Sequence, residues 1–265
     1  MGKILHEGTY ATIREAYHVD TGEAFACKII DKRLLRGREY LVGNEIELLN
    51  RVSYAHSNIV TLHDYFESDN HLYLCFDLCT GGNLSQRISS QGPYSEAGAS
   101  YLIHTLLSAL RSIHSSGLVH GDLTPSTILF RSEDDDTEVM IADFGVSRLV
   151  GDTGNRPGHG TTATMHERDA YVAPERFRQG YCTLSTEPAD VWAIGVLAYY
   201  MLIGHAPFHE MHRDDADDFL FDHVEGKKIS GDARDFVEAC LIVNPYRRPT
   251  VEQVLRHKIR TGLNE

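Results

Sequence analysis

Residues 120–127 read HGDLTPST and place Asp122 directly after a long segment of helical apolar periodicity. A short apolar strand pattern at 139–142 then leads to a second aspartate, in Asp143-Phe144-Gly145. A third motif, Ala173-Pro174-Glu175, ends a polar, glycine-containing and aperiodic segment that is typical of a loop. Each motif alone is weak, but their order and spacing in one chain are difficult to obtain by chance.

The first third of the chain contributes a lysine and a glutamate. Residues 24–30 alternate as a strand does, and Lys28 lies on one face of that strand. A helix is expected around 37–52, where the apolar residues fall on one face together with Glu45. Since burying an unpaired carboxylate is costly, we expect Glu45 to have a partner inside the fold.

Taken as a set, these residues resemble the protein-kinase signature over nearly the whole chain. Asp190 matches the aspartate that opens the central helix of the large lobe in that family. Arg248 matches the arginine that pairs with the glutamate of the third motif, here Glu175. Residues 21–31 and 77–84 look most like the calcium/calmodulin-dependent group of Ser/Thr kinases.

The resemblance implies an α+β, bilobal protein-kinase fold in a single domain, residues 1–265. A small N-terminal lobe (1–79) would be an antiparallel sheet with one key helix, and a larger C-terminal lobe (80–265) would be mostly helical. The sequence pattern agrees, because strands dominate up to about residue 80 and helices afterwards. Within the large lobe, His120 is expected to pack beneath Phe144.

The resemblance also implies ATP with magnesium, or manganese, as cofactors, and it assigns roles residue by residue. Lys28 would hold the α and β phosphates while Glu45 orients it. Asp143 would bind magnesium, and Asp122 would accept or orient the substrate hydroxyl. The remaining expected nucleotide contacts are Gly8 in the glycine-rich loop, Ile13, Ala26 and Leu129 around the adenine, Phe76 as the gatekeeper, and Asp77–Cys79 at the hinge.

The chain departs from the family pattern in both phosphate-handling loops. Only Gly8 remains of the three glycines in the first loop, and His6 takes the place of another. In the catalytic loop, Gly121 replaces the arginine that usually reads an activation-loop phosphate. Thr124 replaces the lysine that neutralises the transferring phosphate, and Thr127 replaces the asparagine that binds the second magnesium.

These replacements leave two functional interpretations open. The first is a pseudokinase that binds ATP and has a regulatory or scaffolding role, because losing one preorganised transition-state contact typically costs about 10²–10³-fold in rate. The second is an active Ser/Thr protein kinase that transfers the γ-phosphate to protein hydroxyls. It is favoured by the retained charged residues, by a hydroxyl at Thr127 that can still ligate magnesium, and by a positive charge at Arg168 in the expected substrate-docking loop. A drifted or truncated gene product is a third, blander interpretation, since Met1 lies close to the glycine-rich loop.

Net charge indicates the class of partner. With a formal charge of −13, the chain repels phosphate backbones and anionic membrane surfaces, so neither nucleic acid nor a membrane is an expected partner. A protein substrate or docking partner, if attracted electrostatically, would be basic. Acidic runs at Glu133–Asp136 and Asp214–Asp218 could attract it, although such runs are more often solvated loops.

Cysteine usage and apolar runs indicate the compartment. The five cysteines show no CxxC pair or zinc-like spacing, which favours a reducing, intracellular environment. Cys75 and Cys79 are interpreted as small core residues rather than redox sensors. No signal peptide is evident, and the longest apolar run, 191–204, is too short to span a bilayer. The sequence therefore predicts a soluble intracellular protein.

Overall fold

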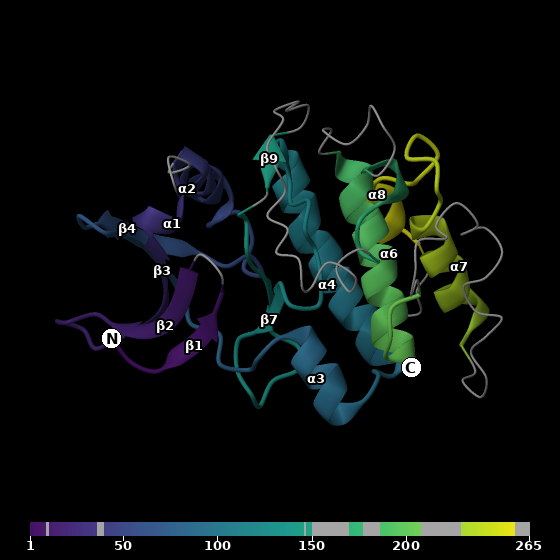
Figure 1. The fold of residues 1–265 in the computed structure, drawn as a ribbon. Helices are drawn as coiled ribbons and strands as arrows, with labels where there is room; N and C mark the ends of the chain where they lie inside the picture. Colours follow the sequence, from purple (N-terminus) through teal and green to yellow (C-terminus); the bar gives the residue numbers. More distant parts are fainter. Residues whose placement is uncertain are drawn as a thin grey trace.

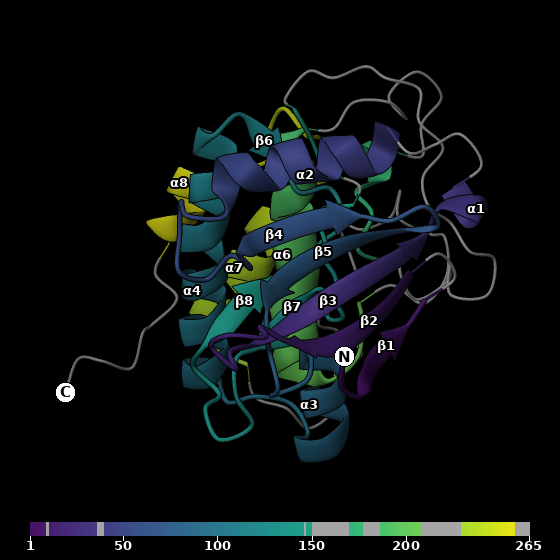
Figure 2. The same ribbon diagram turned by 90° about the vertical axis from the view of Figure 1, so that its left-hand side faces the viewer.

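A computed structural model of the chain describes residues 1–8, 11–35, 40–145, 147–149, 170–176, 186–207 and 229–257, which form two lobes (Figure 1). The small lobe is a five-stranded antiparallel sheet in the order β1-β2-β3-β5-β4. Its strands are β1 (Ile4–Glu7), β2 (Ala11–Tyr17), β3 (Ala24–Asp31), β4 (Leu62–Glu67) and β5 (His71–Asp77). The short helix α1 (Lys32–Leu35) follows β3, and the longer α2 (Tyr40–Val52) lies across the sheet (Figure 2).

The periodicity of α2 explains how the helix attaches to the sheet. The buried side chains on it include Val42, Leu49 and Val52, spaced so that they share one face. Glu45 lies on the same face and is 6% exposed, as the periodicity predicts. Glu47 points to solvent, where its carboxylate accepts a hydrogen bond from Arg51 at 3.0 Å. The expected start of this helix, near Gly37, lies outside the described residues.

The large lobe is mainly helical and also contains short antiparallel strand pairs. Its helices in the described ranges are α3 (Leu84–Gln91), α4 (Glu96–Ser115), α6 (Glu187–Ile203), α7 (Gly231–Cys240) and α8 (Val251–Leu255), with a 3-10 turn, η1, at Pro174–Arg176. The strand pairs are β6 (Leu118–Val119) with β9 (Arg148–Leu149), and β7 (Ile128–Phe130) with β8 (Val139–Ile141). The predicted α+β fold, with an antiparallel-sheet lobe and a helical lobe, is confirmed.

Helix α6 is the centre of the large lobe. It contacts both α4 and α7, and nearly all of its side chains are buried, including Trp192 (Figure 1). None of the helices in the described ranges is long and apolar enough to cross a membrane. The strongly apolar composition of α6 matches the burial of its side chains by the surrounding protein.

The segment that joins the lobes passes very close to the β7–β8 hairpin. The Gly81 N–H donates a hydrogen bond to the Phe130 carbonyl at 3.0 Å, and the Thr80 N–H donates to the Arg131 carbonyl at 3.0 Å. A Cβ atom on Gly81 would lie 2.0 Å from the carbonyl oxygen of Ser132. Only glycine fits this approach without displacing the backbone.

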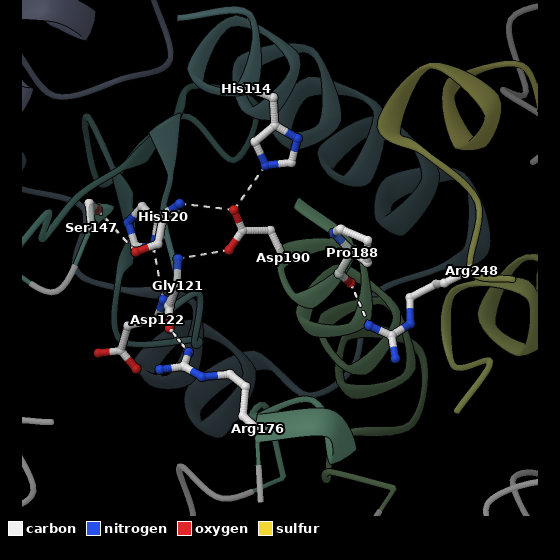
Figure 3. Close-up of polar contacts among 9 residues, drawn as sticks. All are labelled: His114, His120, Gly121, Asp122, Ser147, Arg176, Pro188, Asp190 and Arg248. Carbon is white, nitrogen blue, oxygen red and sulfur yellow. Dashed lines mark hydrogen bonds and ion pairs between the residues drawn. The ribbon is translucent and has the colours of Figure 1, made fainter. Parts of the chain in front are cut away.

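A buried carboxylate at the start of α6 organises the 120–127 loop. Asp190 is 1% exposed and accepts hydrogen bonds from the His120 N–H at 2.9 Å, the Gly121 N–H at 2.7 Å and His114 Nε2 at 2.9 Å (Figure 3). Burial alone would raise the pKa of Asp190, but the hydrogen bonds and the positive potential of the histidines outweigh burial and lower it. Asp190 therefore holds the loop against α4 and α6 as a carboxylate.

A second buried charge also lies near the start of α6. Arg248 Nη1 and Nη2 donate to the two carboxylate oxygens of Glu175 at 2.8 and 2.9 Å. Nη1 also donates to the Pro188 carbonyl at 2.7 Å (Figure 3). The Arg248 guanidinium lies 5.1 Å from the centre of the Trp192 ring. The expected pairing of Glu175 with Arg248 is thus confirmed, and it joins η1, α6 and the segment before α8.

We predict that Arg248→Ala lowers the free energy of unfolding by about 3–5 kcal/mol, because it leaves the Glu175 carboxylate buried without its partner. The measurement is urea denaturation followed by circular dichroism. Arg247→Ala is the matched control, since the neighbouring Arg247 is exposed. An Arg248→Ala protein as stable as the control would contradict the assigned role of the pair.

We also predict that the stability advantage of the wild type over Asp190→Asn shrinks in acid. A carboxylate with a lowered native pKa contributes its full stability above the ordinary Asp pKa of about 3.9 and loses it as pH falls through the native value. Urea denaturation of both proteins at neutral pH and near pH 3 measures the difference. A gap of the same size at both pH values would show that the Asp190 charge does not hold the loop.

Candidate active site

Glu45, which is expected to have a partner inside the fold, forms an ion pair with Lys28. The Lys28 ammonium on β3 lies 2.6 Å from Glu45 Oε1 on α2 and 3.9 Å from Asp143 Oδ1 in the large lobe. Burial alone would lower the pKa of Lys28, but the two carboxylates outweigh that effect and raise it, so the lysine carries its charge. The ammonium group therefore links the sheet, α2 and the large lobe at one point.

Asp143 stands in a backbone conformation that few residues adopt. Its φ of 65° makes it the one non-glycine residue with positive φ among those that the structure describes. Next to it, Phe144 is 1% exposed, and its ring packs edge-on against His120 with centroids 5.0 Å apart, as expected. The buried ring thus anchors the motif, while the Asp143 carboxylate stays about half exposed beside Lys28.

Asp122 is held through its neighbours in the loop. The Asp122 N–H donates to His120 Nδ1 at 3.3 Å, and the Ser147 hydroxyl donates to the His120 carbonyl at 3.0 Å (Figure 3). The Gly121 backbone has a positive φ of 78°, the left-handed region that favours glycine. Gly121 therefore both removes an arginine side chain and fits the local backbone without strain.

Arg176 is a contact that the sequence did not reveal. Its Nη1 donates to the Gly121 carbonyl at 2.6 Å, and the guanidinium lies beside Asp122 in the close-up (Figure 3). The Arg176 guanidinium thus contacts the 120–127 loop at Gly121, the residue that replaces the arginine of the family pattern. The signal in the sequence was an arginine directly after Ala173-Pro174-Glu175 combined with a glycine at 121.

The two threonines of the loop are directed into the loop itself. Thr124 and Thr127 are each 3% exposed. Thr124 Oγ1 lies 2.9 Å from the hydroxyl of Ser126, and Thr127 Oγ1 accepts from the Thr124 N–H and donates to the Thr124 carbonyl, both at 3.0 Å. The hydroxyl of Thr127 therefore closes a local turn, and using it as a metal ligand would compete with these bonds.

Strand register gathers several expected nucleotide contacts on one face of the sheet. Ile13 pairs with Lys28, and Ala26 pairs with Phe76. Since directly paired residues share a face and side chains alternate along a strand, these four side chains lie on the same face. Leu129 lies in β7 of the large lobe. The structure thus brings Ile13, Ala26, Lys28 and Phe76 together on the small-lobe side.

The hinge and the first loop are more restricted than expected. The Asp77 carboxylate accepts from the Thr61 N–H at 2.8 Å and contacts His63 Nε2 at 2.9 Å, and the Asp77 N–H donates to the Thr61 carbonyl at 3.3 Å. These bonds limit Asp77 to its own carbonyl as a nucleotide contact. In the first loop, the Gly8 N–H donates a hydrogen bond to the Ala11 carbonyl at 2.9 Å. At the hinge, burial raises the pKa of the Cys79 thiol to about 11.

The chemistry of this donor set fits a nucleotide phosphate with a hard divalent cation. A half-exposed carboxylate, Asp143, supplies an oxygen ligand, and the Lys28 ammonium beside it supplies a positive charge for phosphate oxygens. A second carboxylate, Asp122, is held by the loop that Asp190 organises. Arg168, the expected docking-loop residue, lies outside the described residues.

Comparisons with known proteins agree with this geometry. Residues 1–259 match the family model of the protein kinase domain. The chain is 43% identical over 264 residues to the calcium/calmodulin-dependent protein kinase cmkB of Emericella nidulans, covering 97% of this chain and 63% of that protein. It is 39% identical to the calcium/calmodulin-dependent protein kinase type I of Schizosaccharomyces pombe, covering 97% of this chain and 76% of the relative.

A human relative, calcium/calmodulin-dependent protein kinase type 1B, is 38% identical, covering 96% of this chain and 72% of its own length. The chain thus spans about two thirds to three quarters of the curated relatives that it matches. Both the family match and the geometry around Lys28, Asp122 and Asp143 support one assignment. The chain belongs to the protein kinase family and is similar to the calcium/calmodulin-dependent protein kinases.

Proposed function

We propose that this chain is a single nucleotide-binding protein kinase domain, with lobes divided near residue 79, in which Ser/Thr phosphotransfer is slowed or lost. The observation that carries the proposal is the inward direction of Thr124 and Thr127. Thr124 brings no positive charge to the transferring phosphate, and its hydroxyl is bonded to Ser126. Thr127 uses its hydroxyl in a turn of the loop, where the family places a metal-binding amide.

Nucleotide binding is proposed because the charges it needs are retained. Lys28, held by Glu45, would bind the α and β phosphates, and Asp143 would hold the metal. When bound there, magnesium or manganese would supply positive charge that neutralises the phosphates. Ile13, Ala26, Phe76 and Leu129 would enclose the adenine, with the Asp77 carbonyl and the Cys79 backbone at its edge.

The expected loss of rate is large but does not require complete inactivity. Removing one preorganised contact to the transition state costs about 10²–10³-fold, and effects within one site are not additive. The domain would then act chiefly through nucleotide-dependent docking. We infer a basic protein partner, since the chain carries a formal charge of −13.

A second candidate is an active Ser/Thr protein kinase. It is favoured by the closed Lys28–Glu45 pair and by the Arg176 bond to Gly121, which together hold both halves of the site in place. In this case Asp122 would orient the substrate hydroxyl toward the γ-phosphate. The relatives that the chain matches carry kinase names, which is consistent with this candidate.

The first test is transfer of labelled γ-phosphate from magnesium- or manganese-ATP to a Ser/Thr peptide pool and to the protein itself. We expect transfer at least about 10²-fold slower than that of a calcium/calmodulin-dependent protein kinase assayed beside it, while ATP still raises the thermal unfolding midpoint of the wild type. Transfer at the rate of that kinase, and lost in an Asp143→Ala control, would establish the active kinase instead. A midpoint unaffected by ATP would contradict nucleotide binding.

The second test restores the family residues. We predict that Thr124→Lys combined with Thr127→Asn raises phosphotransfer by about 10²-fold or more, because it returns a cation and a metal-binding amide to the loop. Thr124→Ser combined with Thr127→Ser keeps both hydroxyls, adds neither the cation nor the amide, and serves as the control. Equal rates in the double variant and the control would show that these threonines do not limit catalysis.

A further inference from the structure

Two cysteines face each other across the middle of the small-lobe sheet. Cys27 on β3 is the direct register partner of Cys75 on β5, and the two strands are neighbours in the sheet (Figure 2). Directly paired residues of antiparallel strands project to the same face. Since side chains alternate along β3, that face is the opposite of the one that carries Lys28.

The row of residues on this face places the two thiols between charged neighbours. Across the sheet, Arg14 pairs with Cys27, Cys27 with Cys75, and Cys75 with Asp64. Arg14 is itself held by its guanidinium, which donates to the Gly2 carbonyl at 3.0 and 3.3 Å. The two thiols therefore lie in a row of side chains whose positions are set by strand register and, at Arg14, by hydrogen bonds.

The two thiols differ in access and acidity. Cys27 is fully buried, whereas Cys75 is partly exposed. A hydrogen bond between the thiols raises the pKa of Cys27, which burial raises further, and the same bond lowers the pKa of Cys75. Since the thiolate is the reactive form, Cys75 is the thiol that an oxidant meets first.

The spacing of paired strands suits a disulfide. Opposed residues in antiparallel strands have Cα atoms about 4.5–5.5 Å apart. Disulfides span Cα separations of about 4.4–6.8 Å, so the backbone needs no large movement to close the bond. The disulfide would close a loop of the chain that runs from β3 to β5 and contains α2 and β4. The bond would therefore join the two ends of this segment of the small lobe.

We propose that Cys27 and Cys75 form a redox modification site that closes to a reversible disulfide when the protein meets a peroxide. The Cys75 thiolate attacks one oxygen of hydrogen peroxide, the O–O bond breaks, and a sulfenic acid forms with release of hydroxide, which takes up a proton to give water. The Cys27 sulfur then attacks the Cys75 sulfur, the S–O bond breaks, and the departing hydroxide takes the Cys27 thiol proton and leaves as a second water. Two thiols are oxidised and one peroxide is reduced to two waters, and a dithiol reductant reverses the change.

This site is independent of the proposed function, since disulfide formation can be measured without nucleotide or transfer. The disulfide would nonetheless affect the residues next to the two cysteines in the strands. Lys28 follows Cys27 in β3, and Phe76 follows Cys75 in β5, both on the face assigned to the nucleotide. A covalent bond between the strands would fix the separation of these two side chains.

The experiment uses the full chain with Cys182→Ser, because Cys182 lies outside the described residues and its pairing must be ruled out by substitution. Reduced, folded protein is freed of reductant, treated with hydrogen peroxide, alkylated under denaturing conditions, digested and analysed by mass spectrometry. We expect a cross-linked peptide pair joining Cys27 to Cys75, present before and absent after treatment with dithiothreitol. Cys79→Ser is the matched control and should give the same cross-link, since Cys79 lies outside the row.

Single variants separate the steps. In Cys27→Ala, Cys75 should accumulate sulfenic acid, detected by a dimedone label, because no resolving thiol remains. In Cys75→Ala, Cys27 should stay reduced while the protein is folded, because it is buried. The proposal is overturned if the wild type takes the dimedone label at Cys75 without forming the cross-link, or if the cross-link joins Cys75 to Cys79. A folded protein whose Cys75 stays reduced at peroxide levels that oxidise a free thiol peptide would overturn it equally.

Discussion

The arrangement of the site depends on the buried carboxylate of Asp190. Its two oxygens accept backbone hydrogen bonds from residues 120 and 121 and a side-chain contact from His114, so one charge fixes α4, α6 and the 120–127 loop together. A buried carboxylate is tolerated there because several donors satisfy it. The position of Asp122 follows from this constraint, since the Asp122 N–H is bonded to the ring of His120 in turn.

From that fixed loop the site extends to both lobes. Phe144, packed against His120, sets the place of Asp143, and Lys28 meets Asp143 from the opposite lobe. The charges that a phosphate requires are therefore held by core packing and by a buried ion pair. The two threonines stand where the family pattern has a cation and an amide, and the proposed function therefore expects a larger effect on phosphotransfer than on nucleotide binding.

The sequence could predict the parts of the site that rest on local motifs and periodicity. The inward face of α2 identified Glu45, and the resemblance to the protein kinases implied the pairing of Glu175 with Arg248 and the packing of His120 on Phe144. The rest depends on contacts between distant segments. Arg176 reaches Gly121 across 55 positions of the chain, and Cys27 meets Cys75 only through strand register. The direction of the Thr127 hydroxyl is a rotamer choice, which residue identity alone does not fix.

Gly121 also bears on how this loop could change over evolutionary time. Its φ of 78° suits glycine, and its carbonyl is already bound by Arg176. An arginine introduced at 121 would enter a left-handed backbone conformation and add a second cation near the first. The two positions are therefore expected to be epistatic, with the effect of a substitution at one depending on the residue at the other.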